Sequence, residues 1–164
     1  MTDHRFRLLF VCTGNTCRSP LAERIARREA ERRGWADDVD IRSAGIAAFP
    51  GQGASDGSRT VAAEEGLDLS DHRATLLTPE LARGSDLILA MSRGHLVRAE
   101  ELGAGAAAVL LGDFAEDRPG EGPGVPDPFG GPIEQYRETF RVLETLVARA
   151  MDRLPLTQDA GDRG

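Results

Sequence analysis

The sequence predicts an α/β fold: a small doubly wound sheet of four parallel strands with helices on both faces. Short runs of large apolar residues alternate with segments of helical apolar spacing, which is typical of parallel sheets. The chain of 164 residues is long enough for one domain with its own core. We expect this domain at residues 1–154, followed by a disordered tail at residues 155–164. The first apolar run leads into a polar loop, which this fold places at the carboxyl edge of the sheet, where ligands bind.

Four short segments are predicted to be buried strands because they are rich in large apolar residues and too short for typical helices. They are residues 5–11, 39–44, 86–91 and 107–111, the last being the weakest. Five other segments are predicted to be helices, since each combines apolar residues at helical spacing with a capping or terminating residue. They are residues 20–33, 59–65, 78–84, 93–102 and 132–153.

Capping residues define several of these boundaries. Pro20 suits the first position of a helix, and Gly34 ends that helix. Ser58 is predicted to cap the second helix. Residues 112–131 contain too many glycines and prolines for regular structure, so we expect an irregular segment there.

The charge balance limits the classes of partner. The net charge is -7, with 27 acidic residues against 20 basic ones, and all the basic residues are arginine. This balance argues against nucleic acid or an anionic membrane as the main partner. No apolar stretch reaches the length of a membrane span, and the N-terminal residues are too charged for a secretory signal. We therefore expect a monomeric cytoplasmic protein in which both cysteines are thiols.

Residues 11–20, VCTGNTCRSP, carry most of the residue types that perform chemistry. If this loop curls with the backbone N–H groups of residues 13–18 pointing inward, those groups and the following helix N-terminus form a cradle for an anion. Gly14 and Asn15 best tolerate the positive φ angles that such a curl requires. The loop therefore predicts a binding site for a phosphoryl group.

Cys12 lies at the base of this predicted cradle. The field of a helix N-terminus and of a nearby arginine favours a thiolate over a thiol, so we expect Cys12 to be nucleophilic. Arg18 offers a planar pair of N–H donors that matches two phosphoryl oxygens. Ser19 is able to donate a hydrogen bond to the sulfur. A tetrahedral phosphoryl group held over a thiolate describes phosphoryl transfer to cysteine.

Other interpretations of the loop fit the sequence less well. A Walker-type loop requires a lysine, which this chain lacks, and a zinc site needs more ligands than Cys12, Cys17 and three scattered histidines supply. We therefore expect neither a metal nor a cofactor. Thioredoxin-like motifs have fewer residues between their cysteines than the four found here. His72 and His95 are expected to be surface or structural residues. The alternative to an enzyme is a non-catalytic anion-binding or redox-sensing module that uses both cysteines.

The loop resembles that of the low-molecular-weight protein tyrosine phosphatase family, which has the form VCxGNxCRSP. The resemblance continues through Ser43-Ala44-Gly45, residues 86–91 and Asp127-Pro128, and covers nearly the whole chain. It implies that Cys12 is the nucleophile, Arg18 the phosphate clamp and Asp127 the general acid. It also implies that the substrate is bound by the remaining loop residues, namely Thr13, Gly14, Asn15, Thr16, Cys17 and Ser19. Cys17 would be the family's second cysteine, able to form a reversible disulfide with Cys12.

Asp127 also fits the chemistry without the resemblance. The leaving group needs a proton, and a carboxyl group on a separate loop can give one and later recover one from the hydrolytic water. Pro126 and Pro128 limit the backbone freedom of that loop.

Two differences from tyrosine-directed members of the family concern the substrate. This chain has Thr16 where many of them carry an aliphatic residue, and Phe129-Gly130 where they carry two tyrosines. Thr16 together with residues 127–131 resembles the protein-arginine phosphatase branch, which implies phosphorylated proteins as partners and phosphoarginine as the expected substrate. Phosphotyrosine is the alternative, because Phe49 and Phe129 could frame a phenyl ring. Arsenate reductases of this fold need further cysteines, and none follows Cys17.

Overall fold

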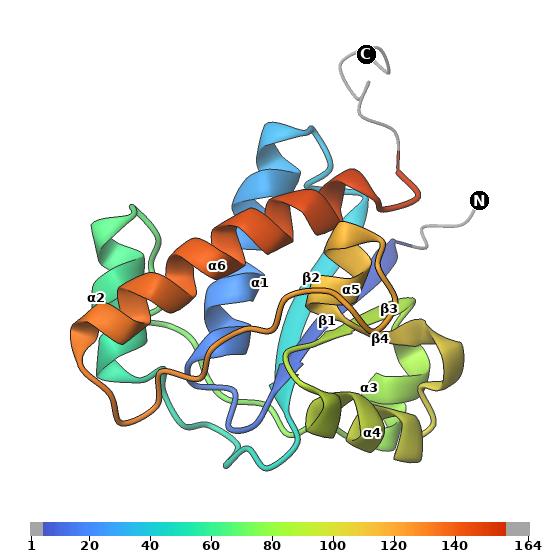
Figure 1. Ribbon diagram of the computed structural model, residues 1–164, viewed down its shortest axis with the longest axis horizontal. Helices are drawn as coiled ribbons and strands as arrows, with labels where there is room; N and C mark the ends of the chain where they lie inside the picture. Colours follow the sequence, from blue (N-terminus) through green and yellow to red (C-terminus); the bar gives the residue numbers. More distant parts are fainter. Residues whose placement is uncertain (1–4, 157–164) are drawn as a thin grey trace.

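The computed structural model describes residues 5–156, which form one sheet covered by helices on both faces (Figure 1). The strands are β1 (Phe6–Cys12), β2 (Val39–Gly45), β3 (Leu87–Ala90) and β4 (Ala108–Leu110). Their order is β2-β1-β3-β4, and every pairing is parallel. The fold class predicted from the sequence is confirmed. Strand β2 lies on one side of β1 and β3 on the other, so the chain crosses β1 after β2. The switch point of the sheet therefore lies at the carboxyl end of β1.

The helices of the described chain form two layers. They are α1 (Arg18–Arg32), α2 (Asp56–Glu64), α3 (Pro79–Gly84), α4 (Arg93–Glu101), α5 (Leu111–Glu116) and α6 (Ile133–Asp152), with a 3₁₀ turn at Gly105–Ala107. Successive residues of β1 point to opposite faces. Leu8 and Phe10 pack into the larger core under α1, α2, α5 and α6, whereas Leu9 and Val11 pack against α3 and α4 (Figure 1). Burial on both faces fixes β1, and with it the start of the loop that follows.

The sequence predictions are wrong for α2 and α5. Helix α2 begins at Asp56 and is capped by Ser55, whose hydroxyl accepts a hydrogen bond from the backbone of Ser58 at 3.3 Å. Ser58, the predicted cap, is fully buried within the helix. Helix α5 begins at Leu111, the last residue of the predicted fourth strand, and continues into the segment predicted to be irregular, because Leu111 and Ala115 pack into the larger core and stabilise a short helix despite its glycine.

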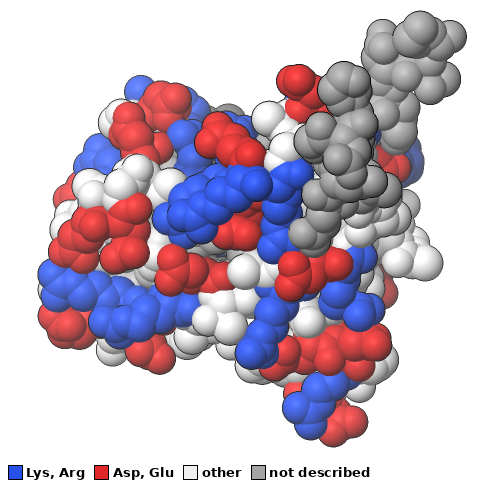
Figure 2. Space-filling model, turned by 90° about the horizontal axis from the view of Figure 1, so that it is seen from above, with Lys and Arg blue, Asp and Glu red and all other residues white. Residues whose placement is uncertain are grey.

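Arginines and acidic residues are mixed over the face of the molecule shown in Figure 2. Many of them form ion pairs; Arg137, for example, contacts both Glu64 and Glu134. Among residues 5–156, no helix is long and apolar enough to cross a membrane. Residues 157–164 of the predicted disordered tail lie outside the described residues. The domain boundary at residue 154 stays a prediction.

Candidate active site

The loop between β1 and α1 leaves the carboxyl end of the central strand and contacts the segment after β2. The carbonyl oxygens of Cys12 and Thr13 accept hydrogen bonds from the N–H groups of Ile46 and Ala47 at 3.0 and 2.9 Å. Gly45 permits this approach, because a Cβ atom there would lie 2.4 Å from the Thr13 oxygen. The glycine of the sequence SAG is therefore explained by the close passage of one backbone over the other.

Asn15 fixes the curl of this loop. It has a φ angle of 57° and is fully buried. Its side-chain oxygen accepts the backbone N–H of Thr75 at 2.8 Å, and its side-chain nitrogen donates to the hydroxyls of Ser19 and Ser43 at 2.8 and 2.9 Å. Asparagine is therefore required for its amide as well as for its tolerance of positive φ. The expectation of a positive φ at Gly14 is wrong, since Asn15 alone makes that turn.

The hydrogen bonds behind Cys12 have a defined direction. Because the Asn15 nitrogen can only donate, the Ser19 oxygen accepts from it and keeps its own proton available. The sulfur of Cys12 lies 2.9 Å from that oxygen. The same reasoning leaves the proton of Ser43 for Glu23, whose carboxylate lies 2.5 Å away. Ser19 is thus oriented to donate a hydrogen bond to the Cys12 sulfur.

Arg18, at the start of α1, and Asp127, in the segment between α5 and α6, lie next to each other. Helix α1 begins at Arg18, two residues earlier than predicted, so this residue lies at a helix N-terminus. One guanidinium nitrogen donates to the carbonyl of Val125 at 3.4 Å, and the other lies 3.6 Å from the Asp127 carboxylate. The second Asp127 oxygen accepts the backbone N–H of Phe129 at 3.1 Å. The arginine is buried, whereas the carboxylate is 55% exposed.

A cavity of about 310 Å³ joins these groups. Its lining residues are Cys12, Thr13, Gly14, Thr16, Cys17, Arg18, Ala47, Phe49, Gln52, Asp127 and Phe129. The structure therefore brings together all the predicted site residues except Asn15 and Ser19, which are buried behind the loop and support it. Ala47 and Gln52 were not predicted, because neither residue type suggests this chemistry in a sequence.

Both cysteines are free thiols, but their surroundings differ. The Cys17 thiol donates to the Ser55 hydroxyl at 3.3 Å and lies 3.8 Å from the Tyr136 hydroxyl. Cys12 instead has Ser19 as its hydroxyl neighbour. Within residues 5–156, no cluster of three or more histidine, cysteine or acidic side chains could hold a metal ion.

His72 and His95 are structural residues and not surface ones, as both are almost completely buried. The Nε2 atom of His72 donates to the backbone oxygen of Asn15 at 2.7 Å. The Nε2 atom of His95 lies 2.8 Å from the Thr13 hydroxyl, and its Nδ1 atom lies 3.0 Å from the Ser92 hydroxyl. Burial, assisted by the positive charge of Arg18, lowers the pKa of His95 to about 4. His95 is therefore neutral at physiological pH and supports the loop through Thr13.

His95 makes stability depend on pH. The unfolded chain protonates this residue near its ordinary pKa of 6.5, whereas the folded chain does so only near 4. Between these values the unfolded state binds more protons, so the folded state loses stability as the pH falls. We expect His95→Gln to reduce the dependence of Tm on pH in this range. The same slope in variant and wild type would contradict this assignment.

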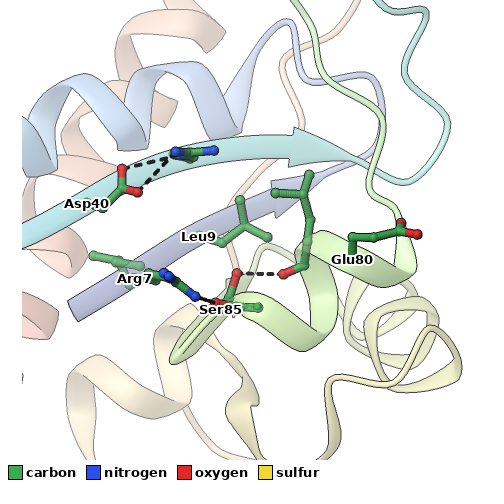
Figure 3. Close-up of a pocket in the computed structure, with 9 residues that line it drawn as sticks. Arg7, Leu9, Asp40, Glu80 and Ser85 are labelled. Atoms are coloured by element: carbon green, nitrogen blue, oxygen red, sulfur yellow. Dashed lines mark hydrogen bonds and ion pairs between the residues drawn. The ribbon is translucent and has the colours of Figure 1, made fainter. Parts of the chain in front are cut away.

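A second cavity, of about 320 Å³, lies near the start of β1 and β2 and is shown in Figure 3. Arg7, Asp40 and Arg42 in its lining have partners close by. Arg42 pairs with Asp40 at 3.2 Å, and Arg7 donates to the carbonyl of Gly84 at 3.2 Å. The hydroxyl of Ser85 donates to a carbonyl of α3. This cavity therefore lacks an activated nucleophile, and the chemistry belongs to the cavity at Cys12.

Comparison with known proteins identifies the family. The family model described as low molecular weight phosphotyrosine protein phosphatase matches residues 7–159. A protein-arginine-phosphatase of Geobacillus stearothermophilus is 36% identical over 155 residues, which cover 93% of this chain and 99% of the relative. The low molecular weight protein-tyrosine-phosphatase Wzb of Escherichia coli (strain K12) is 36% identical over 145 residues, covering 87% and 88% of the two chains. A solved structure of a YwlE arginine phosphatase mutant with a phosphorylated active-site serine is 34% identical, has a TM-score of 0.84 and covers 94% of this chain and 99% of its own. With a matching fold and a family model that spans nearly its whole length, this chain belongs to the low molecular weight phosphotyrosine protein phosphatase family.

Proposed function

We propose that this chain is a protein phosphatase that hydrolyses phosphoarginine in phosphorylated proteins through a phosphocysteine intermediate. First, the Cys12 sulfur attacks phosphorus, the P–N bond to the guanidine breaks, and Asp127 gives its proton to the leaving nitrogen. Water then attacks the phosphocysteine, Asp127 takes a proton from that water, and phosphate leaves as the Cys12 thiolate is restored. The observation that carries this proposal is the convergence of Cys12, Arg18 and Asp127 on one cavity.

Arg18 supplies the charge that phosphoryl transfer needs. Its guanidinium is held at the cavity by the carbonyl of Val125, and its N–H groups match the oxygens of a bound phosphoryl group. The helix N-terminus at the same residue adds to the positive field. Because these groups stabilise the negative charge of the transition state, we propose that no metal ion takes part.

The proposal of phosphoarginine depends on acceptors for the guanidinium N–H groups. Thr16 lines the cavity, and its hydroxyl has one weak neighbour, the Cys17 sulfur at 3.8 Å. The Asp127 carboxyl group is another acceptor within the same lining. A guanidinium bound away from water requires such partners, whereas a phenyl ring does not. The protein-arginine-phosphatase relative of Geobacillus stearothermophilus supports the same substrate.

Thr16→Ile tests this assignment. Leaving a buried donor without a partner costs about 1–3 kcal/mol, so kcat/KM on phosphoarginine peptides is expected to fall on the order of tenfold or more. The kcat/KM on matched phosphotyrosine peptides should hold or rise, since isoleucine adds apolar contact with a ring. Thr16→Ser keeps the hydroxyl and serves as the control. If the wild type prefers phosphotyrosine and Thr16→Ile changes neither value, phosphoarginine is the wrong substrate.

Phosphotyrosine remains the second candidate because of two exposed aromatic residues. Phe49 and Phe129 line the cavity and are each 77% exposed, which is unusual for side chains of this size. Both are available to pack against a phenyl ring. The relative Wzb, a protein-tyrosine-phosphatase, is consistent with this reading. The peptide comparison above distinguishes the two candidates directly.

A further inference from the structure

The loop that carries Asp127 is not held in place by Asp127 itself. This side chain is 55% exposed and has one ion pair, to Arg18 at 3.6 Å, and one backbone contact, to Phe129 within its own loop. An ion pair of this length in which one partner is exposed contributes little to order. In Figure 1 the segment between α5 and α6 runs back along α6 before entering that helix. The groups that position the acid should therefore lie on α6.

Thr139 of α6 makes the first such contact. Its hydroxyl donates to the carbonyl of Pro126, the residue before Asp127, at 3.3 Å. Thr139 has no exposed surface. A buried hydroxyl costs free energy unless it is hydrogen-bonded, so this contact favours the observed position of the loop.

Tyr136, three residues earlier on α6, contacts the cradle. Its hydroxyl lies 3.8 Å from the Cys17 sulfur, and burial raises the pKa of this phenol, with the neighbouring Cys17 adding to the effect. The ring lies flat against Gly57, where an added Cβ atom would be 2.6 Å from three ring carbons. Tyr136 is therefore fixed in place and joins α6 to the cradle.

Tyr136 and Thr139 are three residues apart on α6 and so lie on one face of that helix. We propose that the Thr139 hydroxyl is a positioning group for the general acid: it holds the backbone before Asp127 against α6, which Tyr136 anchors to the cradle, and so places the Asp127 carboxyl group over the cavity at Cys12. This inference rests on the proposed function, in which Asp127 protonates the leaving group. Neither residue touches the reacting atoms.

The dependence of rate on the leaving group tests the proposal. Thr139→Val removes the hydroxyl at nearly constant shape. We expect it to lower kcat/KM on the order of tenfold for phenyl phosphate, whose leaving group needs a proton, and to change kcat/KM little for nitrophenyl phosphate. Thr139→Ser should restore the wild-type pattern. Thr145→Val makes the same change at an exposed position of the same helix and should have no effect.

A second measurement separates positioning from a general structural role. In an Asp127→Asn background, adding Thr139→Val should cost little more, because both changes act through one carboxyl group. Tyr136→Phe should show the same selectivity for poor leaving groups and keeps the proposal testable if Thr139→Val does not fold. The positioning role would be overturned if Thr139→Val lowered kcat/KM equally for phenyl phosphate and nitrophenyl phosphate. It would also be overturned if Thr139→Val caused its full loss of kcat/KM in the Asp127→Asn background.

The proposed function and this inference fail in different ways. If Asp127→Asn slows phenyl phosphate turnover while Thr139→Val and Tyr136→Phe leave it unchanged, the positioning role is wrong and the acid assignment stands. If Asp127→Asn itself has no effect on a poor leaving group, the acid assignment fails and the positioning role fails with it.

Discussion

Replacing Cys12 by serine is expected to abolish turnover of phosphorylated substrates while binding of inorganic phosphate is retained. A serine hydroxyl is not ionised at neutral pH, and Ser19, the hydrogen-bond partner of Cys12 at 2.9 Å, is oriented to donate a proton and not to accept one. The serine is therefore a weaker nucleophile than cysteine, and a phosphoserine formed there would pass its phosphoryl group to water far more slowly than phosphocysteine does. The backbone cradle and Arg18 are unchanged. Aryl phosphate turnover and calorimetric titration with phosphate measure the two properties on the same sample.

Two results would count against this account of Cys12. Turnover by Cys12→Ser at a rate near that of the wild type would exclude a covalent mechanism through this sulfur. A wild-type chain that binds phosphate but turns over no aryl phosphate, with or without reductant, would favour the alternative of a non-catalytic anion-binding or redox-sensing module.

Asp127→Asn is expected to slow turnover about 10²–10⁴-fold when the leaving group is poor, which is the usual size of general acid–base assistance. An asparagine side-chain oxygen can still accept the backbone N–H of Phe129, a bond that measures 3.1 Å in this structure. The substitution thus removes the transferable proton and preserves the local turn. The measurement is kcat/KM for a series of aryl phosphates whose phenol pKa increases.

The slope of kcat/KM against the phenol pKa shows whether Asp127 is the acid. In the wild type, protonation by Asp127 should make the rate nearly independent of the phenol pKa, whereas in Asp127→Asn the rate should fall steeply as the phenol becomes more basic. Parallel plots for the two proteins would show that another group is the acid.

The sequence predicts the centre of this site well because its parts are close together in the chain. Cys12, Asn15, Arg18 and Ser19 lie within one loop, and the apolar run before it and the amphipathic helix after it are both strong local signals. The alternation of strands and helices then places that loop at the carboxyl edge of a parallel sheet. The observed order of strands, with β1 in the interior, agrees with this reasoning.

The supporting residues could not be predicted in the same way. Tyr136 and Thr139 are part of an ordinary amphipathic helix, and His95 is one polar residue in a short helix. Their roles arise from contacts between distant parts of the sequence; His95 and Thr13, for example, are more than 80 residues apart. Such contacts follow from packing that no local sequence pattern specifies. The start of α2 was missed for a related reason, since Ser55 and Ser58 are equally good caps and burial decides between them.

In the proposed mechanism the phosphoryl group passes through the sulfur of Cys12. The direct measurement is peptide mass spectrometry on protein denatured during turnover of a good leaving-group substrate, when the phosphoenzyme accumulates if its hydrolysis is the slower step. Asp127→Asn should slow that hydrolysis as well and increase the yield. We expect the mass of one phosphoryl group on the peptide that contains Cys12. A turning-over enzyme with no phosphoryl group on this peptide, or with one on another residue, would contradict the mechanism.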